Sequence, residues 1–129
     1  MNEVDYLVGD AAKFGILTVS DRAHAGEYQD EGGPAILEFF EQAVRSEWTH
    51  HSIIVPDEQQ QIEQALIDLS DSKGCDVIVT TGGTGPAIRD VTPEATIAVC
   101  ERIMPGFGEQ MRAISLAFVP TAILSRQVG

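Results

Sequence analysis

The sequence has 129 residues, of which 43% are hydrophobic and 22% charged, and its net charge at pH 7 is −12. This composition is typical of a single folded domain and excludes a disordered or fibrous chain. The acidic balance disfavours partners such as nucleic acid or a membrane surface, because Lys and Arg make most contacts with phosphates. No apolar run approaches the roughly 20 residues of a membrane span, and residues 1–13 lack the pattern of a secretory signal, so a cytoplasmic protein is expected.

The first half of the chain is expected to contain two strands, each followed by a helix. A β-branched run at residues 14–20 predicts a strand buried on both faces, and residues 52–55 predict a second. Pro34 suits the first position of an amphipathic helix, which we expect to follow the polar segment 21–33. Asp57 is the expected N-cap of the next helix.

The second half of the chain continues this alternation. A strand is predicted at residues 76–81, directly before a glycine-rich segment. Thr92 is the expected hydroxyl cap of a helix that has proline and an acidic residue in its first turn. A further helix is predicted at residues 107–118 and a fourth strand at residues 121–124.

Alternating strands and helices predict an α/β fold with a parallel sheet, covered on both faces by right-handed crossovers. In such folds, ligands bind at the carboxyl ends of the strands, where the polar loops of this chain also lie. The sequence stops soon after the predicted fourth strand, and no helix follows to cover that strand. We therefore expect that the C-terminal part of the domain is missing from this sequence.

The glycine-rich segment at residues 82–86 has the sequence GGTGP and lies between a predicted strand and a predicted helix. Glycines in this context let backbone N–H groups approach a phosphate. The segment matches neither a Walker A loop nor the dinucleotide fingerprint, so a simple tight turn is the alternative interpretation. Arg89 and Asp90, which follow closely, favour the phosphate-binding interpretation.

Two further polar segments are expected at the same edge of the sheet. Ser20, Asp21 and Arg22 follow the first strand, and Asp57 follows the second. Taken alone, these residues fit a solvated loop and a helix cap. Together with Asp90 and the glycine backbone they suit a magnesium–nucleotide site, since Mg²⁺ takes oxygen ligands and bridges carboxylates to phosphates.

The two cysteines are expected to have no part in this chemistry. Cys75 and Cys100 lack the spacing of a zinc site, and a disulfide is not expected in a reducing compartment. We interpret both as small core residues.

Several short motifs occur in one order along the chain: TVSDR at 18–22, QD at 29–30, TGGTGP at 81–86, RDVTP at 89–93, MPGFGE at 104–109 and LSR at 124–126. Together they resemble the molybdopterin adenylyltransferase family of the bacterial Mog type, which is similar also to the G domain of gephyrin and its plant counterpart. The resemblance covers nearly the whole chain from about Gly15 onward. It implies a Rossmann-like three-layer domain, usually a homotrimer, that uses ATP and Mg²⁺ to adenylylate molybdopterin for a molybdenum insertase.

The resemblance also implies roles for individual residues. Asp57 and Asp90 match the functional aspartates of the family, which implies metal binding and catalysis. The other implied pocket residues are Ser20, Asp21, Arg22, Gly82, Gly83, Thr84, Gly85, Glu109, Ser125 and Arg126. Among these, the glycine-rich loop would hold substrate phosphates, and the pair near the end of the chain would contact the pterin.

The sequence departs from the family in one respect. The family continues with another strand and an Asn-Leu-Pro-Gly turn that this sequence lacks, so residues 1–129 are expected to form a single domain truncated at its C-terminus. The alternative functions are a non-catalytic molybdopterin carrier, the related insertase domain, and an unrelated phosphate-binding regulator. The absence of the larger companion domains argues against the insertase.

Overall fold

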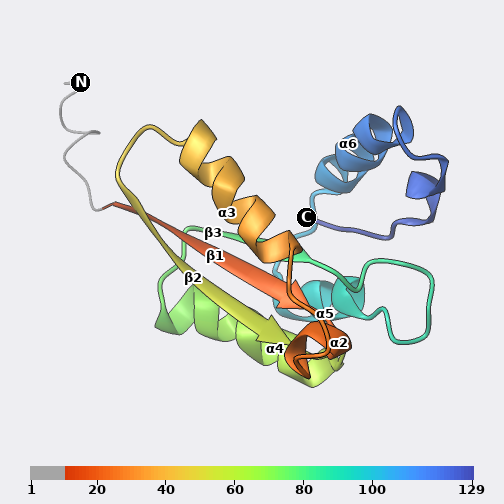
Figure 1. Cartoon of the computed structure of the whole chain (residues 1–129), viewed down its shortest axis with the longest axis horizontal. Helices are drawn as coiled ribbons and strands as arrows, with labels where there is room; N and C mark the ends of the chain where they lie inside the picture. Colours follow the sequence, from red (N-terminus) through yellow and green to blue (C-terminus); the bar gives the residue numbers. More distant parts are fainter. Residues whose placement is uncertain (1–10) are drawn as a thin grey trace.

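The computed structural model describes residues 11–129, which form a three-stranded sheet with helices on both faces (Figure 1). The strands are β1 (Ala12–Val19), β2 (Trp48–Val55) and β3 (Val77–Thr81). Their order is β2-β1-β3, and both neighbouring pairs are parallel. The expected parallel α/β architecture is therefore confirmed, and the run over residues 52–55 belongs to a longer strand than expected.

One face of the sheet is covered by α3 (Gly32–Ala43), which packs on an aromatic cluster. The rings of Phe14 and Phe40 stack with their centroids 4.2 Å apart, and Trp48 meets Phe14 edge-on at 5.7 Å. Such pairs add to the stabilisation that comes from burying the rings themselves. This cluster fixes α3 against β1 and β2.

The opposite face is covered by α4 (Gln59–Ile67) and α5 (Thr92–Val99), which gives the molecule three layers. Leu17 of β1 and Ile62 of α4 are both fully buried in this second core. A π-helical turn, η1 (Asp68–Ser72), extends α4 and adds Leu69 to the same cluster. The central strand β1 is thus buried on both sides, as its β-branched sequence predicts.

The C-terminal part of the structure differs from the prediction. It contains α6 (Pro105–Leu116) and a 3₁₀ helix, η2 (Pro120–Leu124), so the predicted strand at residues 121–124 is wrong. Pro120 starts a series of short turns in which Ala122 N–H donates to Val119 and Ser125 N–H to Ala122. Because these donors are used locally, the segment does not pair with the sheet.

Two predicted helix caps are also wrong. The N-cap positions of α4 and α5 are Glu58 and Val91, and neither side chain caps its helix. The side chains of Asp57 and Thr92 bind other parts of the chain, as described below. Within residues 11–129, no helix is both long and apolar enough to cross a membrane.

Candidate functional site

The carboxyl ends of the three strands bring together segments that are far apart in the sequence (Figure 1). Ser20 follows β1, and its backbone N–H donates to the carbonyl of Val55 at the end of β2. Gly82 follows β3 and lies so close to Val19 that a side chain would collide with the Val19 carbonyl. The expected convergence of the polar loops on one rim is therefore present in the structure.

Asp21 and Asp57 join two of these loops through a reciprocal pair of hydrogen bonds. The backbone N–H of Asp21 donates to Oδ2 of Asp57 at 2.8 Å, and the backbone N–H of Asp57 donates to Oδ1 of Asp21 at 3.0 Å. This pairing explains why Asp57 is not a helix cap, since its Oδ2 serves the first turn of α2 (Asp21–His24).

Arg89 connects the third loop to this pair. Its Nε and Nη2 donate to the two carboxylate oxygens of Asp21 at 2.7 and 2.9 Å, and Nη2 also donates to Glu58 at 2.9 Å. The hydrogen bond from Arg89, followed by the backbone N–H of Asp57, lowers the pKa of Asp21 below its ordinary value. Sequence reasoning left the role of Arg89 open; the structure shows an ion pair that links all three loops.

The glycine loop after β3 depends on two residues with left-handed backbone. Gly82 and Gly83 have φ of 94° and 71°, a conformation that side chains with a Cβ adopt at a cost. A Cβ on Gly83 would collide with the hydroxyl of Thr92 and lie 3.3 Å from Oδ1 of Asp57. The Thr92 hydroxyl instead donates to the carbonyl of Gly82 at 2.9 Å, which holds the loop against the start of α5.

The backbone N–H groups of this loop are available for a ligand. Within the described residues 11–129, no hydrogen bond is donated by the N–H of Gly83, Thr84 or Gly85. Adjacent unpaired N–H groups in a glycine-rich turn attract anions, because they present several partial positive charges together. This favours phosphate binding over the simple tight turn.

Asp90 folds back over the same loop. Its Oδ2 accepts the backbone N–H of Ala87 at 3.1 Å and lies 2.8 Å from the position of a Cβ on Gly85. In the part of the chain that the structure describes, Oδ1 of Asp90 and Oδ1 of Asp57 accept no hydrogen bond. Each carboxylate therefore has one oxygen bound within the protein and one that can meet a ligand.

The segment after η2 also reaches this loop. The backbone N–H of Arg126 donates to Thr84, and its guanidinium donates to the carbonyls of Gly85 and Asp90 and to Glu94. Ser125 is half-buried beside it, where its Oγ accepts the N–H of Gln127 at 3.4 Å. The pair that the resemblance assigns to the pterin thus reaches the glycine loop through Arg126.

The segment after β1 is more open. The Ser20 hydroxyl accepts the N–H of Ala23 at 3.2 Å and lies 3.1 Å from the hydroxyl of Tyr28. The guanidinium of Arg22 stacks over the Tyr28 ring and lies 3.9 Å from Glu27. Because a contact of this length between exposed groups is weak, Arg22 can turn toward a bound anion.

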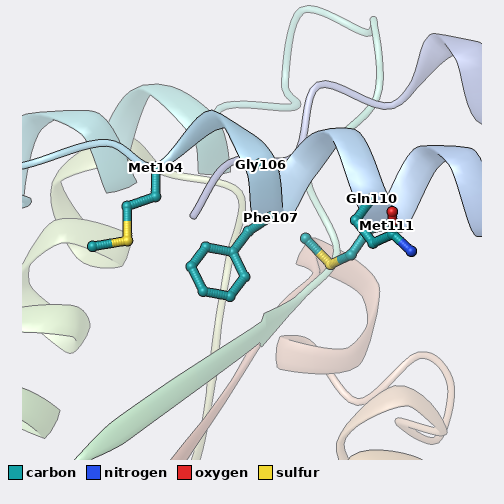
Figure 2. Close-up of a pocket in the computed structure, with 5 residues that line it drawn as sticks. All are labelled: Met104, Gly106, Phe107, Gln110 and Met111. Atoms are coloured by element: carbon teal, nitrogen blue, oxygen red, sulfur yellow. The ribbon is translucent and has the colours of Figure 1, made fainter.

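Glu109 is not drawn into this arrangement. It is exposed on α6, and no described residue forms a hydrogen bond or an ion pair with its carboxylate. Figure 2 shows a different feature of this helix, an open apolar pocket of about 450 Å³, with the side chains of Met104, Phe107 and Met111 on one side of α6. Its lining lacks the charged groups that a phosphate needs, so we place the functional site at the glycine loop.

Several residues that shape the rim had no role assigned from the sequence, although Asp30 lies in the QD motif. Glu58 and Glu94 bind the two arginines, Tyr28 contacts Ser20, and Asp30 joins Thr18 to the start of α3. The signal for Asp30 was its position two residues before the Gly-Gly-Pro start of the helix, which is typical of a capping side chain. The other contacts join distant segments and left no local pattern.

The described side chains do not form a complete metal site by themselves. Within residues 11–129, no group of three or more His, Cys, Asp or Glu side chains could hold a metal ion. Mg²⁺, however, usually takes one or two carboxylates and completes its coordination with water and substrate phosphates. The free oxygens of Asp57 and Asp90 are carboxylate ligands of the type that Mg²⁺ takes.

The comparison with protein families agrees with this geometry. The family described as "Probable molybdopterin binding domain" matches residues 15–129. The chain belongs to this family. The matched segment of this probable molybdopterin-binding domain contains β2, β3, every loop of the rim and all of β1 except its first residues.

Similar sequences include molybdopterin adenylyltransferases from several bacteria. The chain is 60% identical over 117 residues to the molybdopterin adenylyltransferase of Haemophilus influenzae and 57% identical to that of Escherichia coli K12. Each alignment covers 91% of this chain but only 59% and 60% of the relative, so the chain spans about three fifths of the length of these relatives.

Solved structures show the same fold. The molybdopterin biosynthesis enzyme MoaB from Thermus thermophilus is 44% identical and superposes with a TM-score of 0.80, covering 91% of this chain and 72% of that one. The Mog protein of Mycobacterium ulcerans is 40% identical, with a TM-score of 0.81 and coverage of 92% and 75%. The three-layer α/β architecture with a parallel sheet is thus that of the MoaB and Mog structures.

Proposed function

We propose that this chain is the core of a molybdopterin adenylyltransferase, which transfers AMP from ATP to the terminal phosphate of molybdopterin and releases pyrophosphate. The names of the relatives support this activity. The observation that carries the proposal is the set of unpaired N–H groups on Gly83, Thr84 and Gly85, next to the free carboxylate oxygens of Asp57 and Asp90. In this proposal, donors for phosphate and ligands for Mg²⁺ would lie on one rim.

The reaction needs no covalent enzyme intermediate. A terminal phosphate oxygen of molybdopterin attacks the α-phosphorus of ATP in line, the bond to the bridging oxygen breaks, and pyrophosphate leaves. Catalysis then depends on positioning and on neutralising charge. The N–H groups of the glycine loop hold phosphate oxygens, and Ser20, Asp21 and Arg22 border the pocket on the side of β1.

Asp57 and Asp90 would hold Mg²⁺ through their free oxygens. The bound ion would supply positive charge to the polyphosphate, which this acidic protein otherwise lacks. Two guanidinium groups of the rim are already paired, Arg89 with Asp21 and Glu58, and Arg126 with Glu94, which leaves only Arg22 among the described rim residues free to turn toward a phosphate. Their charge is therefore largely balanced within the protein, so neutralisation of the phosphates falls to the nucleotide-bound cation.

The proposal extends to the setting of the enzyme. We expect the complete protein to be a cytoplasmic homotrimer that passes adenylylated molybdopterin to a molybdenum insertase. We also propose that residues 1–129 form one molybdopterin-binding domain. In this domain Ser125 contacts the pterin.

The test is pyrophosphate release by the full-length protein in the presence of molybdopterin, ATP and Mg²⁺. Asp57→Asn and Asp90→Asn keep an oxygen for the backbone N–H bonds but remove the charge, and each should slow turnover by at least about 100-fold. Pterin binding should change little. Asp76→Asn is the matched control, because Asp76 also accepts a backbone N–H, from Lys13, but lies before β3 at the amino end of the sheet.

One outcome of this assay would contradict the enzymatic proposal. If the wild-type protein binds molybdopterin but releases no pyrophosphate with ATP, the chain is a carrier domain and the enzymatic proposal is wrong. Full AMP transfer by Asp90→Asn would remove that residue from the mechanism.

A further inference from the structure

Arg126, which the resemblance assigns to the pterin, makes several contacts with the glycine loop and the segment that follows it. Its backbone N–H donates to Thr84 at 2.7 Å, and its Nε donates to Gly85 at 2.9 Å. Its Nη2 donates to the carbonyl of Asp90 at 2.6 Å, and Nη1 binds Glu94 at 2.9 Å. One residue therefore holds both ends of the segment between β3 and α5.

These contacts determine the direction of one of the three unpaired N–H groups of the loop, that of Gly85. In a trans peptide, the C=O and the following N–H point in opposite directions. Because the carbonyl of Thr84 faces the backbone of Arg126, the N–H of Gly85 faces away from it. For the same reason, the N–H of Val91 points away from the guanidinium that binds the carbonyl of Asp90.

The positive charge of Arg126 is paired within the protein. Its guanidinium pairs with Glu94, and this hydrogen bond lowers the pKa of the Glu94 carboxyl below its usual value. The side chains of Arg126 and Glu94 are 42% and 41% exposed, so they are accessible but occupied. An arginine that contacted an anionic ligand directly would have to give up this partner.

We propose that Arg126 is a positioning residue that holds the loop through the carbonyls of Thr84, Gly85 and Asp90 and so keeps the N–H of Gly85 turned toward the phosphate. The inference rests on the proposed function of the loop as a phosphate site. It assigns Arg126 a role in phosphate binding and turnover rather than a direct contact with the pterin.

Glu94 separates these two roles, because they predict opposite effects of the same substitution. If Arg126 positions the loop, Glu94→Gln loosens its anchor and weakens binding of a phosphate ligand. If Arg126 contacts the ligand directly, Glu94→Gln frees the guanidinium and tightens binding. In the first case the double variant Glu94→Gln/Arg126→Ala should be no worse than Arg126→Ala alone.

The experiment measures two quantities on the full-length protein: hydrogen exchange of the amides of residues 82–91, and the affinity for Mg²⁺–pyrophosphate by calorimetry. We expect Arg126→Ala to speed exchange in the loop and to weaken pyrophosphate binding about tenfold. Arg126→Lys should recover little, because an ammonium cannot span the acceptors that a planar guanidinium reaches. Arg102→Ala is the control, since the exposed Arg102 has no hydrogen bond or ion pair to the other described residues.

Steady-state kinetics complete the test. Positioning predicts that Arg126→Ala lowers kcat and raises KM for both substrates, whereas direct contact predicts a higher KM for molybdopterin alone. The proposal is overturned by tighter binding in Glu94→Gln, or by wild-type exchange and affinity in Arg126→Ala. If the wild-type protein binds no pyrophosphate, the proposed phosphate site fails, and the exchange data still show whether Arg126 orders the loop.

Discussion

Asp21 and Asp57 each accept the backbone N–H of the other, at 3.0 and 2.8 Å, although they are 36 residues apart. The pair closes the ends of β1 and β2 against each other, and Arg89 adds the loop after β3 by binding both oxygens of Asp21. The rim is thus held by hydrogen bonds between loops.

The first prediction concerns the pH dependence of stability. The Arg89 guanidinium holds the pKa of Asp21 below its ordinary value, so the ionised form stabilises the folded state. That contribution is complete above the unfolded pKa of about 3.9 and is lost as the pH falls through the lower folded pKa. The difference in unfolding free energy between wild type and Asp21→Asn should therefore be constant above about pH 5 and shrink below about pH 4.

Chemical denaturation at several pH values checks this prediction. Arg89→Gln removes the main cause of the shift and should flatten the same pH dependence. A difference between wild type and Asp21→Asn that stays constant down to the acid-unfolding range would contradict the ion pair.

The second prediction separates two effects of the glycine loop. Gly83→Ala adds the strain of a positive φ and a collision with the Thr92 hydroxyl, whereas Gly26→Ala, at φ 76°, adds only the strain because nothing lies within 4 Å. The strained backbone should lower the free energy of unfolding of each variant by about 1–2 kcal/mol. The collision should lower that of Gly83→Ala by a further 1–3 kcal/mol or so. Urea unfolding measures both, and equal losses would mean that the loop relaxes freely.

The third prediction concerns Thr92, which is 2% exposed and donates to the carbonyl of Gly82. Thr92→Val leaves that carbonyl without its donor and should lower the free energy of unfolding by about 1–3 kcal/mol. Hydrogen exchange in the glycine loop should become faster. Thr96→Val is the matched control, since its hydroxyl donates to the carbonyl of Thr92 within α5. The control should leave exchange in the loop unchanged.

The fourth prediction distinguishes the two thiols. Partial burial, and then the nearby Asp76 charge, raise the pKa of Cys75, while Cys100 is exposed at the end of α5. At pH 8, iodoacetamide should modify Cys100 about tenfold faster or more, because the thiolate is the reactive form. Mass spectrometry of the single variants Cys75→Ser and Cys100→Ser gives both rates. Faster modification of Cys75 would contradict its placement against the core.

The elements that the sequence predicts correctly are those whose own residues determine them. The β-branched run of β1 and the strand that ends at Val55, before Pro56, could be predicted without knowledge of their partners. The convergence of the loops after β1, β2 and β3 follows from the parallel sheet, because parallel strands end at one edge. The interpretation of Cys100 as a core residue is wrong, since α5 ends at Val99 and leaves it at the exposed C-cap.

The features that could not be predicted depend on distant residues. Residues 121–124 suit a strand as well as a 3₁₀ turn, and only the presence of a pairing partner decides between them. Asp57 has the sequence context of a helix cap, but its Oδ2 binds the N–H of Asp21. Arg89 and Arg126 look alike in sequence, and only their neighbours show that one joins the strand ends and the other holds the glycine loop.

The unpaired N–H groups of residues 83–85 lie in a protein whose net charge is −12. Backbone dipoles attract an anion only at short range, whereas the acidic surface repels it over about 10 Å at 0.1 M salt. A polyphosphate should therefore bind faster as ionic strength rises, until screening removes the long-range barrier. Basic phosphate-binding proteins, which draw in their ligands electrostatically, behave in the opposite way.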